Sequence, residues 1–522
     1  MGRLPLLLLL SLFLVGIRVL SQHTHQLSRD DFPPDFVFGA ATSAYQVEGA
    51  AAEGGRTPSI WDTYTHAGKM ADKSTGDVTA DQYHKYKEDV KLMHAMGLDA
   101  YRFSISWSRL VPGGRGDVNP MGLQYYNNLI NELIKYGIEP HVTLHHLDLP
   151  QILEDEYGGW LNEKIVEDFT AYADVCFREF GDRVTYWTTL NEPNMFALGG
   201  YDKGILPPQR CSSPYGYGEC KTGNSCTEPY IVTHNMLLAH AAVARLYKQK
   251  YMAKQHGLIG ITIFTFWFAP QTNGTEDVAA AKRALDFMLG WYLNPLVFGD
   301  YPEVMKKNAG SRLPSFSRTQ SALMKGSFDF IGINHYETIT VSNDHEGVTE
   351  EIRDYMGDML AIFVINTSTS GQFLPTVFPV HPWGLQGVLE HIKTSYRNPP
   401  IFVHENGYGM RYSGELNDTA RINYLSLYLE RLLEAVRNGS NTNGYFVWSF
   451  VDCFELLYGY QATFGLYQVD FSDKELSRQA RYSAHWYSTL LKKKKRSFNI
   501  EKLTSSSASR STKQTLVNQF LF

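Results

Sequence analysis

The amino-acid sequence predicts an α/β protein with a single (β/α)8 barrel, a TIM barrel with elaborated loops after its strands, over residues 33–490. Three observations support this prediction. Eight short apolar runs alternate with longer amphipathic stretches between residues 35 and 490. The runs are apolar on both faces, which is typical of parallel strands covered on both sides. No Gly/Pro-rich linker divides the region, which favours one large domain over several.

The eight predicted strands, in order, are residues 36–42, 101–107, 141–146, 186–190, 258–268, 328–336, 401–404 and 445–451. Amphipathic stretches such as 83–96 and 123–136 predict helices between them. A doubly wound open sheet is the structural alternative. It would show a phosphate-binding glycine fingerprint after the first strand, and the sequence has none there.

Composition excludes several broad classes of protein. Of the 522 residues, 43% are hydrophobic, 13% aromatic and 20% charged, so a large core can form and a disordered or fibrous chain is excluded. Forty-eight basic and 54 acidic side chains give a net charge of -6, which argues against a nucleic-acid partner. Residues 492–522 form a basic Ser/Thr-rich tail with a local charge of +7, which leaves -13 for residues 1–491.

The N-terminus predicts a signal peptide over residues 1–21. Arg3 precedes an apolar run at residues 4–17, and cleavage is expected near Ser21. A retained signal anchor is the alternative; no later segment resembles a membrane span. The expected location is the secretory pathway. Four glycosylation sequons agree with this route, at Asn273, Asn366, Asn417 and Asn438.

The five cysteines do not predict a metal site. Cys211, Cys220 and Cys226 lie in a Gly/Ser/Pro-rich stretch, which indicates a loop closed by a disulfide, while Cys176 and Cys453 lie in apolar runs typical of buried thiols. No His or Cys pair has zinc-site spacing around the cluster. We therefore expect no metal and no cofactor.

Polar side chains follow the predicted strands, where a barrel carries its chemistry. They include Gln46 and Glu48, His145, His146 and Asp148, Asn191 and Glu192, Asn334 and Tyr336, Glu405 and Asn406, and Asp452 and Glu455. Glu192 and Glu405 each come directly after an apolar strand, the fourth and the seventh. Retaining glycoside hydrolysis needs two such facing carboxyl groups, one as nucleophile and one as acid. Gln46, His146, Asn191 and Glu455 could bind sugar hydroxyls, and Trp448 could stack on a sugar.

The motifs resemble glycoside hydrolase family 1, in particular the plant β-glucosidases. The similar segments are FVFGAATSAYQVEG at 36–49, YRFSISW at 101–107, TLNEP at 189–193, GWYLNPL at 290–296, FDFIGIN at 328–334, ENG at 405–407 and WSFVDCFE at 448–455. They are in order and span about residues 33–490. The resemblance implies the same barrel and a retaining β-glucosidase that releases terminal β-D-glucosyl residues from a small β-glucoside or an oligosaccharide. It also implies a location outside the cell, in the apoplast, or in the vacuole.

The resemblance also implies roles for individual residues. Glu192 would be the acid/base and Glu405 the nucleophile. The sugar site would be lined by Gln46, His146, Asn191, Glu405, Trp448 and Glu455, with Phe464 beside it. Tyr336 would donate to the nucleophile, Asn334 would support the pair and Arg102 would neutralise charge near Glu405. The disulfide of the family maps to Cys211 and Cys220, with Cys226 as a rival for either partner.

Three positions depart from the family pattern. Leu147 and Leu456 stand where the family has Trp, which affects the sugar preference, and His404 stands where it has Thr. An imidazole beside Glu405 would either perturb the pKa of that carboxyl group or only pack against the barrel wall. Two alternatives to hydrolysis remain: a transglucosidase that uses the same glycosyl-enzyme, and a sugar-binding barrel without catalysis. The sequence does not determine the aglycone or the oligomeric state.

Overall fold

The computed structural model describes residues 27–347, 352–364 and 379–492. The predicted signal peptide, the sequon Asn366 and the tail after Lys492 lie outside this part of the chain. Eight parallel strands form a closed barrel, which confirms the predicted fold. They are β1 (Val37–Ala41), β2 (Ala100–Ser104), β3 (Glu139–His145), β4 (Tyr186–Asn191), β5 (Leu258–Phe264), β7 (Phe330–Asn334), β10 (Ile401–Asn406) and β12 (Thr442–Trp448).

The barrel closes between its first and last strands. β1 pairs with β2 on one side and with β12 on the other, so that Ala41 lies opposite both Arg102 and Trp448. The remaining strands follow in chain order around the ring. The carboxyl ends of all eight strands therefore meet at one face, which brings residues distant in sequence together.

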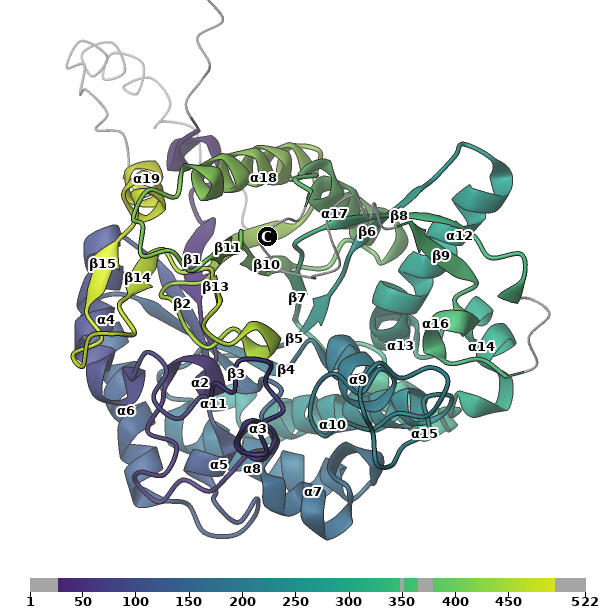
Figure 1. Ribbon diagram of the computed structural model, residues 1–522, viewed down its shortest axis with the longest axis horizontal. Coiled ribbons are helices and arrows are strands. Elements are labelled where there is room, and N and C mark those ends of the chain that lie inside the picture. Colours follow the sequence, from purple (N-terminus) through teal and green to yellow (C-terminus); the bar gives the residue numbers. More distant parts are fainter. Residues whose placement is uncertain (1–26, 348–351, 365–378, 493–522) are drawn as a thin grey trace, which may run out of the picture.

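Helices surround the barrel (Figure 1). The longer ones are α4 (Gln82–Met96), α6 (Pro120–Lys135), α8 (Ile165–Phe180), α9 (Pro193–Tyr201), α10 (Glu228–Lys250), α12 (Thr275–Leu285), α13 (Trp291–Phe298), α17 (Trp383–Ser395), α18 (Thr419–Arg437) and α19 (Tyr482–Leu491). Shorter ones are α2 (Ala44–Val47), α3 (Ile60–His66), α5 (Trp107–Leu110), α7 (Gln151–Tyr157), α11 (Met252–Gln255), α14 (Glu303–Ala309), α15 (Arg318–Met324) and α16 (Tyr355–Asp358). Within the described ranges, no helix combines the length and apolarity that crossing a membrane requires.

Three small sheets elaborate the loops. They join β6 (Trp267–Pro270), β8 (Thr338–Asn343) and β9 (Ala361–Val364), then β11 (Met410–Arg411) with β13 (Ala462–Thr463), and β14 (Tyr467–Val469) with β15 (Arg478–Ala480). One expectation was wrong in detail: residues 258–268 are not a single strand. The chain leaves the barrel after Phe264, and the next strand, β6, pairs with β8 in a separate sheet. The hydrophobic pattern of one continuous apolar run does not show where such a change of sheet occurs.

The interior of the barrel is a packed core. The His141 ring stacks on Tyr186 at 4.2 Å between centroids and lies 4.8 Å from Phe446. Gly332 leaves room for a close approach between neighbouring strands, because a Cβ there would lie 2.2 Å from Thr262 Oγ1 and 2.4 Å from His404 Nδ1. This packing closes the barrel beneath the polar residues at its carboxyl end.

The strands carry irregularities where the two glutamates emerge. The register between β4 and β5 shifts between Thr188 and Asn191, and that between β10 and β7 shifts between Val403 and Glu405. Such bulges redirect side chains at the end of a strand. They place Asn191 and Glu405 at the mouth of the barrel.

Candidate active site

Four strands of the barrel supply one connected group of polar side chains. Arg102 comes from β2, Asn191 from β4, Asn334 from β7 and Glu405 from β10, and Glu192 directly follows β4. All five are buried or nearly so. Hydrogen bonds link them across the mouth of the barrel, so the sequence-predicted pair of glutamates belongs to a single network.

Glu405 is held by two donors, one of which is a cation. Arg102 Nη1 donates to Oε1 at 2.7 Å, and Tyr336 Oη donates to Oε2 at 2.9 Å. Burial raises the pKa of Glu405 above its usual value, and the Arg102 guanidinium, the Tyr336 hydroxyl and the Asn334 amide limit this rise. Both donors favour the ionised carboxylate.

Glu192 lies at the junction between a strand and a helix. Its backbone is in the left-handed region (φ +45°), its N–H donates to the Thr262 carbonyl at 2.9 Å, and Pro193 begins α9. Proline suits the first helical position because no N–H partner is needed there. The contacts around this strained turn hold its backbone in place and so fix the direction of the Glu192 side chain.

The environment of the Glu192 carboxyl group differs from that of Glu405. Its Oε1 accepts a hydrogen bond from Asn334 Nδ2 at 2.7 Å, a neutral donor. Burial and then the Glu405 carboxylate raise the pKa of Glu192 to about 8, and Asn334 and Arg102 oppose the rise. Both carboxyl groups are buried, but only Glu405 is bound directly by a cation, an asymmetry that favours an anion at Glu405 and an acid at Glu192.

The bonds of Asn191 assign the protonation of His146. Asn191 Oδ1 accepts from Arg102 Nη2 at 2.6 Å and from Asn334 Nδ2 at 3.1 Å, so its amide nitrogen faces His146 Nε2 at 3.0 Å. Burial lowers the pKa of His146 well below its usual value, so the ring is neutral. Nε2 must then accept, and the proton is on Nδ1.

Four further predicted residues lie at the same face. Gln46 Nε2 donates to the Phe454 carbonyl at 2.8 Å, and the Trp448 ring stacks on His146 at 5.9 Å with a 22° angle. Phe464 packs edge-on against Tyr336 at 6.1 Å. Glu455 accepts from Trp448 Nε1 at 3.4 Å, and burial raises its pKa to about 8. Carboxyl, amide and aromatic groups thus share one buried environment.

Some polar residues at the strand ends have structural partners instead. Glu48 accepts from Arg109 Nε at 2.8 Å and from Tyr126 Oη at 2.7 Å. Asp452 binds Arg481 through both oxygens, at 2.8 and 2.7 Å. These carboxylates fix the loops after the first and eighth strands.

The departures from the family pattern have different outcomes. His404 Nδ1 lies 2.7 Å from Thr262 Oγ1, its ring stacks on Phe402, and burial lowers its pKa well below the usual value. A neutral ring carries no charge that could act on Glu405, which supports the packing interpretation. Leu147 and Leu456 both have positive φ angles, +68° and +43°.

Sequence reasoning missed the residues that hold Tyr336. Tyr424 and Tyr428 on α18 donate to the Tyr336 carbonyl at 2.9 and 3.0 Å. Their spacing of four residues places them on one helix face, but nothing local predicts a partner 88 and 92 residues away. Gly407 is also required, because a Cβ there would lie 1.9 Å from the Trp448 carbonyl oxygen.

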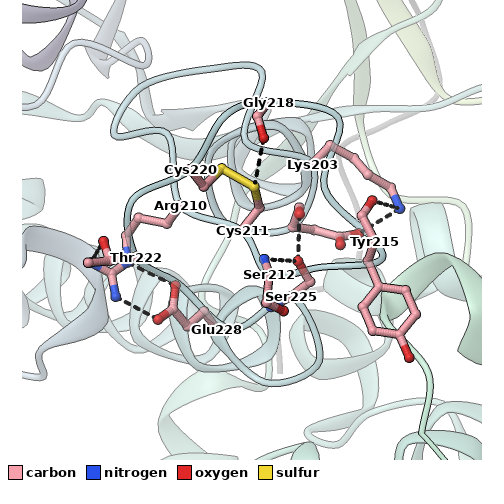
Figure 2. Close-up of a disulfide and its surroundings, with 11 residues drawn as sticks. Lys203, Arg210, Cys211, Ser212, Tyr215, Gly218, Cys220, Thr222, Ser225 and Glu228 are labelled. Atoms are coloured by element: carbon pink, nitrogen blue, oxygen red, sulfur yellow. Dashed lines mark hydrogen bonds and ion pairs between the residues drawn. A yellow bond between two sulfur atoms is a disulfide. The ribbon is translucent and has the colours of Figure 1, made fainter.

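A disulfide closes the loop that follows α9 (Figure 2). Cys211 and Cys220 are joined, and Cys226, Cys176 and Cys453 are free and buried. Arg210 pairs with both oxygens of Glu228 at 2.8 and 2.7 Å beside the bridge. This loop is therefore anchored to α10.

Comparisons with known proteins agree with this geometry. The profile described as glycosyl hydrolase family 1 matches residues 28–496. β-Glucosidase 22 of Oryza sativa is 60% identical over 469 residues, which cover 89% of this chain and 88% of the relative. A cyanidin 3-O-glucoside 7-O-glucosyltransferase (acyl-glucose) of Delphinium grandiflorum is 54% identical over 494 residues, covering 94% and 96%.

Solved structures give the same result. A rice β-glucosidase mutant in a covalent complex with Glc superimposes with a TM-score of 0.86 at 45% identity, covering 90% of this chain and 100% of that one. An aphid myrosinase superimposes with a TM-score of 0.80 at 36% identity, covering 88% and 98%. The chain is a glycosidase and belongs to glycosyl hydrolase family 1.

Proposed function

We propose that this protein is a retaining β-glucosidase that works by double displacement, with Glu405 as nucleophile and Glu192 as acid/base. The observation that carries the proposal is the asymmetry of the two buried carboxyl groups. Glu405 accepts from a guanidinium and a phenol, whereas Glu192 accepts from an amide and has a pKa raised to about 8. Near neutral pH the guanidinium favours an anion at Glu405, and the raised pKa favours a proton on Glu192.

In the first step Glu405 attacks the anomeric carbon, and the bond to the aglycone oxygen breaks as Glu192 transfers its proton to that oxygen. The electron pair of the carboxylate forms the ester bond, and the aglycone leaves as a neutral alcohol or phenol. Tyr336 and Arg102 orient the attacking carboxylate. Asn334 orients the acid.

In the second step Glu192 takes a proton from water, which attacks the anomeric carbon and releases Glu405. Esterification removes the negative charge of Glu405, one of the two causes that raise the pKa of Glu192. The pKa of Glu192 therefore falls in the intermediate, and its carboxylate becomes available as a base. The same residue serves both steps.

Two matched variants test the roles. Glu405→Gly should abolish turnover of aryl β-glucosides, and azide should restore it by forming the α-glucosyl azide in the vacant space. Glu192→Gln should slow substrates with poor leaving groups most, and with an activated aryl glucoside azide should form the β-glucosyl azide. Full residual activity of Glu405→Gly, or the same azide anomer from both variants, would contradict the assignment.

A transglucosidase is the second candidate. The Delphinium relative is a glucosyltransferase by name at 54% identity, which supports transfer from the same intermediate to an acceptor other than water. Product analysis with added alcohols or phenolics separates the two functions: glucose alone supports hydrolysis, and new glucosides support transfer. If a 2-fluoro-glucoside forms no covalent adduct with the wild-type protein, a non-catalytic barrel is favoured.

We further propose that the protein is a glycoprotein of the secretory pathway, located in the apoplast or the vacuole. Asn273, Asn417 and Asn438 are exposed, as glycosylation requires, and each begins an N-x-S/T sequon. Digestion of the plant-expressed protein with an N-glycosidase should reduce its mass. An unchanged mass would argue against this route.

A further inference from the structure

The segment after β12 holds a free thiol beside the proposed sugar site. Asp452 is clamped by Arg481, and the Phe454 N–H donates to the Gln46 carbonyl at 2.9 Å. Cys453, between them, is 1% exposed. Both neighbours are anchored, so the thiol has little freedom to move away from its contacts.

The thiol contacts a carboxyl group of the site directly. Cys453 Sγ lies 3.4 Å from Glu455 Oε1, within hydrogen-bond range for sulfur. Trp448 Nε1 lies 3.4 Å from the other oxygen. Each oxygen of Glu455 therefore has one weak neutral donor on the protein side, and the carboxyl group keeps free lone pairs.

The direction of this hydrogen bond follows from burial and charge. Burial raises the pKa of the Cys453 thiol well above its usual value, and the Glu455 carboxyl group adds to the rise. Sulfur therefore keeps its proton at neutral pH and donates. A deprotonated, nucleophilic or metal-binding role for this cysteine is disfavoured by the same burial.

We propose that Cys453 is a specificity-determining positioning residue: its S–H orients Glu455, and this orientation sets how strictly the site requires the sugar hydroxyl that Glu455 binds. The inference rests on the proposed function, since Glu455 must face the sugar. A buried carboxyl group held on both oxygens presents its remaining lone pairs in one direction. When one holding contact is lost, the group can turn and accept alternative hydroxyl patterns.

The test is a panel of aryl β-glucosides that each lack one hydroxyl. Glu455→Gln first identifies the hydroxyl that Glu455 binds, as the one whose removal is no longer penalised. Cys453→Ala should raise KM for the parent glucoside by roughly threefold to tenfold, the range of one weak hydrogen bond, with little change in kcat. It should reduce the penalty for the same hydroxyl and for no other.

Two substitutions separate the hydrogen bond from packing. Cys453→Ser keeps a donor and should retain the wild-type discrimination, whereas Cys453→Val fills the space without a donor and should resemble Cys453→Ala. Cys176→Ala removes a buried thiol on α8 and should leave the panel unchanged. If Cys453→Ala does not fold, the comparison of Cys453→Ser with Cys453→Val decides.

The results also distinguish this inference from the proposed function. Suppose that the protein turns over glucosides. The role of the thiol would then be overturned if Cys453→Ala and Cys453→Val kept the wild-type penalties for every missing hydroxyl. It would also be overturned if Cys453→Ser lost discrimination as much as Cys453→Ala does. If the wild-type protein turns over no glucoside, the proposed function fails. In that case calorimetry can measure the affinities for glucose and its monodeoxy analogues instead. Cys453→Ala should then reduce the loss of affinity for the analogue that lacks the hydroxyl bound by Glu455, and for no other.

Discussion

Removal of the Arg102 charge should move the pH profile of the enzyme. Arg102 is fully buried and bridges the two halves of the site, with Nη1 on Glu405 and Nη2 on Asn191. The substitution Arg102→Met keeps a buried side chain of similar length but removes the cation. Glu405 would then be a buried carboxyl group without a cation beside it, while the Tyr336 hydroxyl would still donate to Oε2.

The size of the effect follows from the ion pair. Loss of one partner of a buried ion pair costs about 3–5 kcal/mol. One pKa unit corresponds to about 1.4 kcal/mol. If Glu405 avoids this whole cost by taking up a proton, its pKa should rise by roughly 2–4 units. Burial already raises the pKa of Glu405 and Arg102 is the main influence that lowers it, so removal of Arg102 should raise this pKa further. At pH 6 ionised Glu405 should become scarce, and each unit by which its pKa comes to lie above 6 should lower kcat/KM about tenfold.

The assay is the pH dependence of kcat/KM for an aryl β-glucoside. The acid limb of the profile, which reports the lower apparent pKa of the glutamate pair, should shift upward in Arg102→Met. Arg102→Lys, which keeps a charge, should shift it less. Arg109→Met is the matched control, because Arg109 forms a similarly buried ion pair with Glu48 at 2.8 Å. An acid limb at the wild-type position in folded Arg102→Met would refute the reasoning.

Three further predictions concern single contacts. Tyr336→Phe removes the hydroxyl that donates to Glu405 at 2.9 Å. It should lower kcat/KM about 10- to 100-fold, the range for a hydrogen bond to a charged group. An unchanged kcat/KM would exclude a role for this hydrogen bond. Burial and then Asp354 raise the pKa of Asp202 to about 8 in the folded protein, compared with about 4 in the unfolded chain. Protonation of Asp202 therefore stabilises the folded state. This stabilisation is fully present below about pH 4 and is lost as the pH rises to about 8. Asp202→Asn should therefore lose less Tm between pH 5 and pH 8.5 than the wild type; equal slopes in calorimetry would contradict this. Reduction of the Cys211–Cys220 disulfide, whose cysteines are nine residues apart in the sequence, should lower the free energy of unfolding by about 2–3 kcal/mol. Trypsin should then cut this loop before it cuts the barrel. The same order of cleavage with and without reduction would contradict this prediction.

Much of the fold could be predicted because barrel strands are covered on both faces. The apolar runs at 186–190 and 401–404 lie within β4 and β10, and topology alone required their carboxyl ends to share one face. The exit of the chain after Phe264 could not be predicted, because the apolar run continues through β6. Which sheet a strand joins depends on pairing partners distant in the sequence.

The candidate site divides in the same way. The motifs around Glu192 and Glu405 identify two carboxyl groups at strand ends, but not their unequal surroundings. Those depend on the reach of Arg102 and Asn334 across the barrel and on the register shifts that redirect the strand ends. The tyrosines of α18 behind Tyr336 had no signal of their own.

The barrel, the strand ends that carry the polar residues and the family could all be predicted from the amino-acid sequence, because each depends on local hydrophobic patterns or contiguous motifs. The unequal surroundings of the two carboxyl groups became visible in the folded protein alone. The pKa of a buried group depends on desolvation and on charges within a few ångströms. For Glu192 and Glu405 those charges come from other strands of the closed barrel.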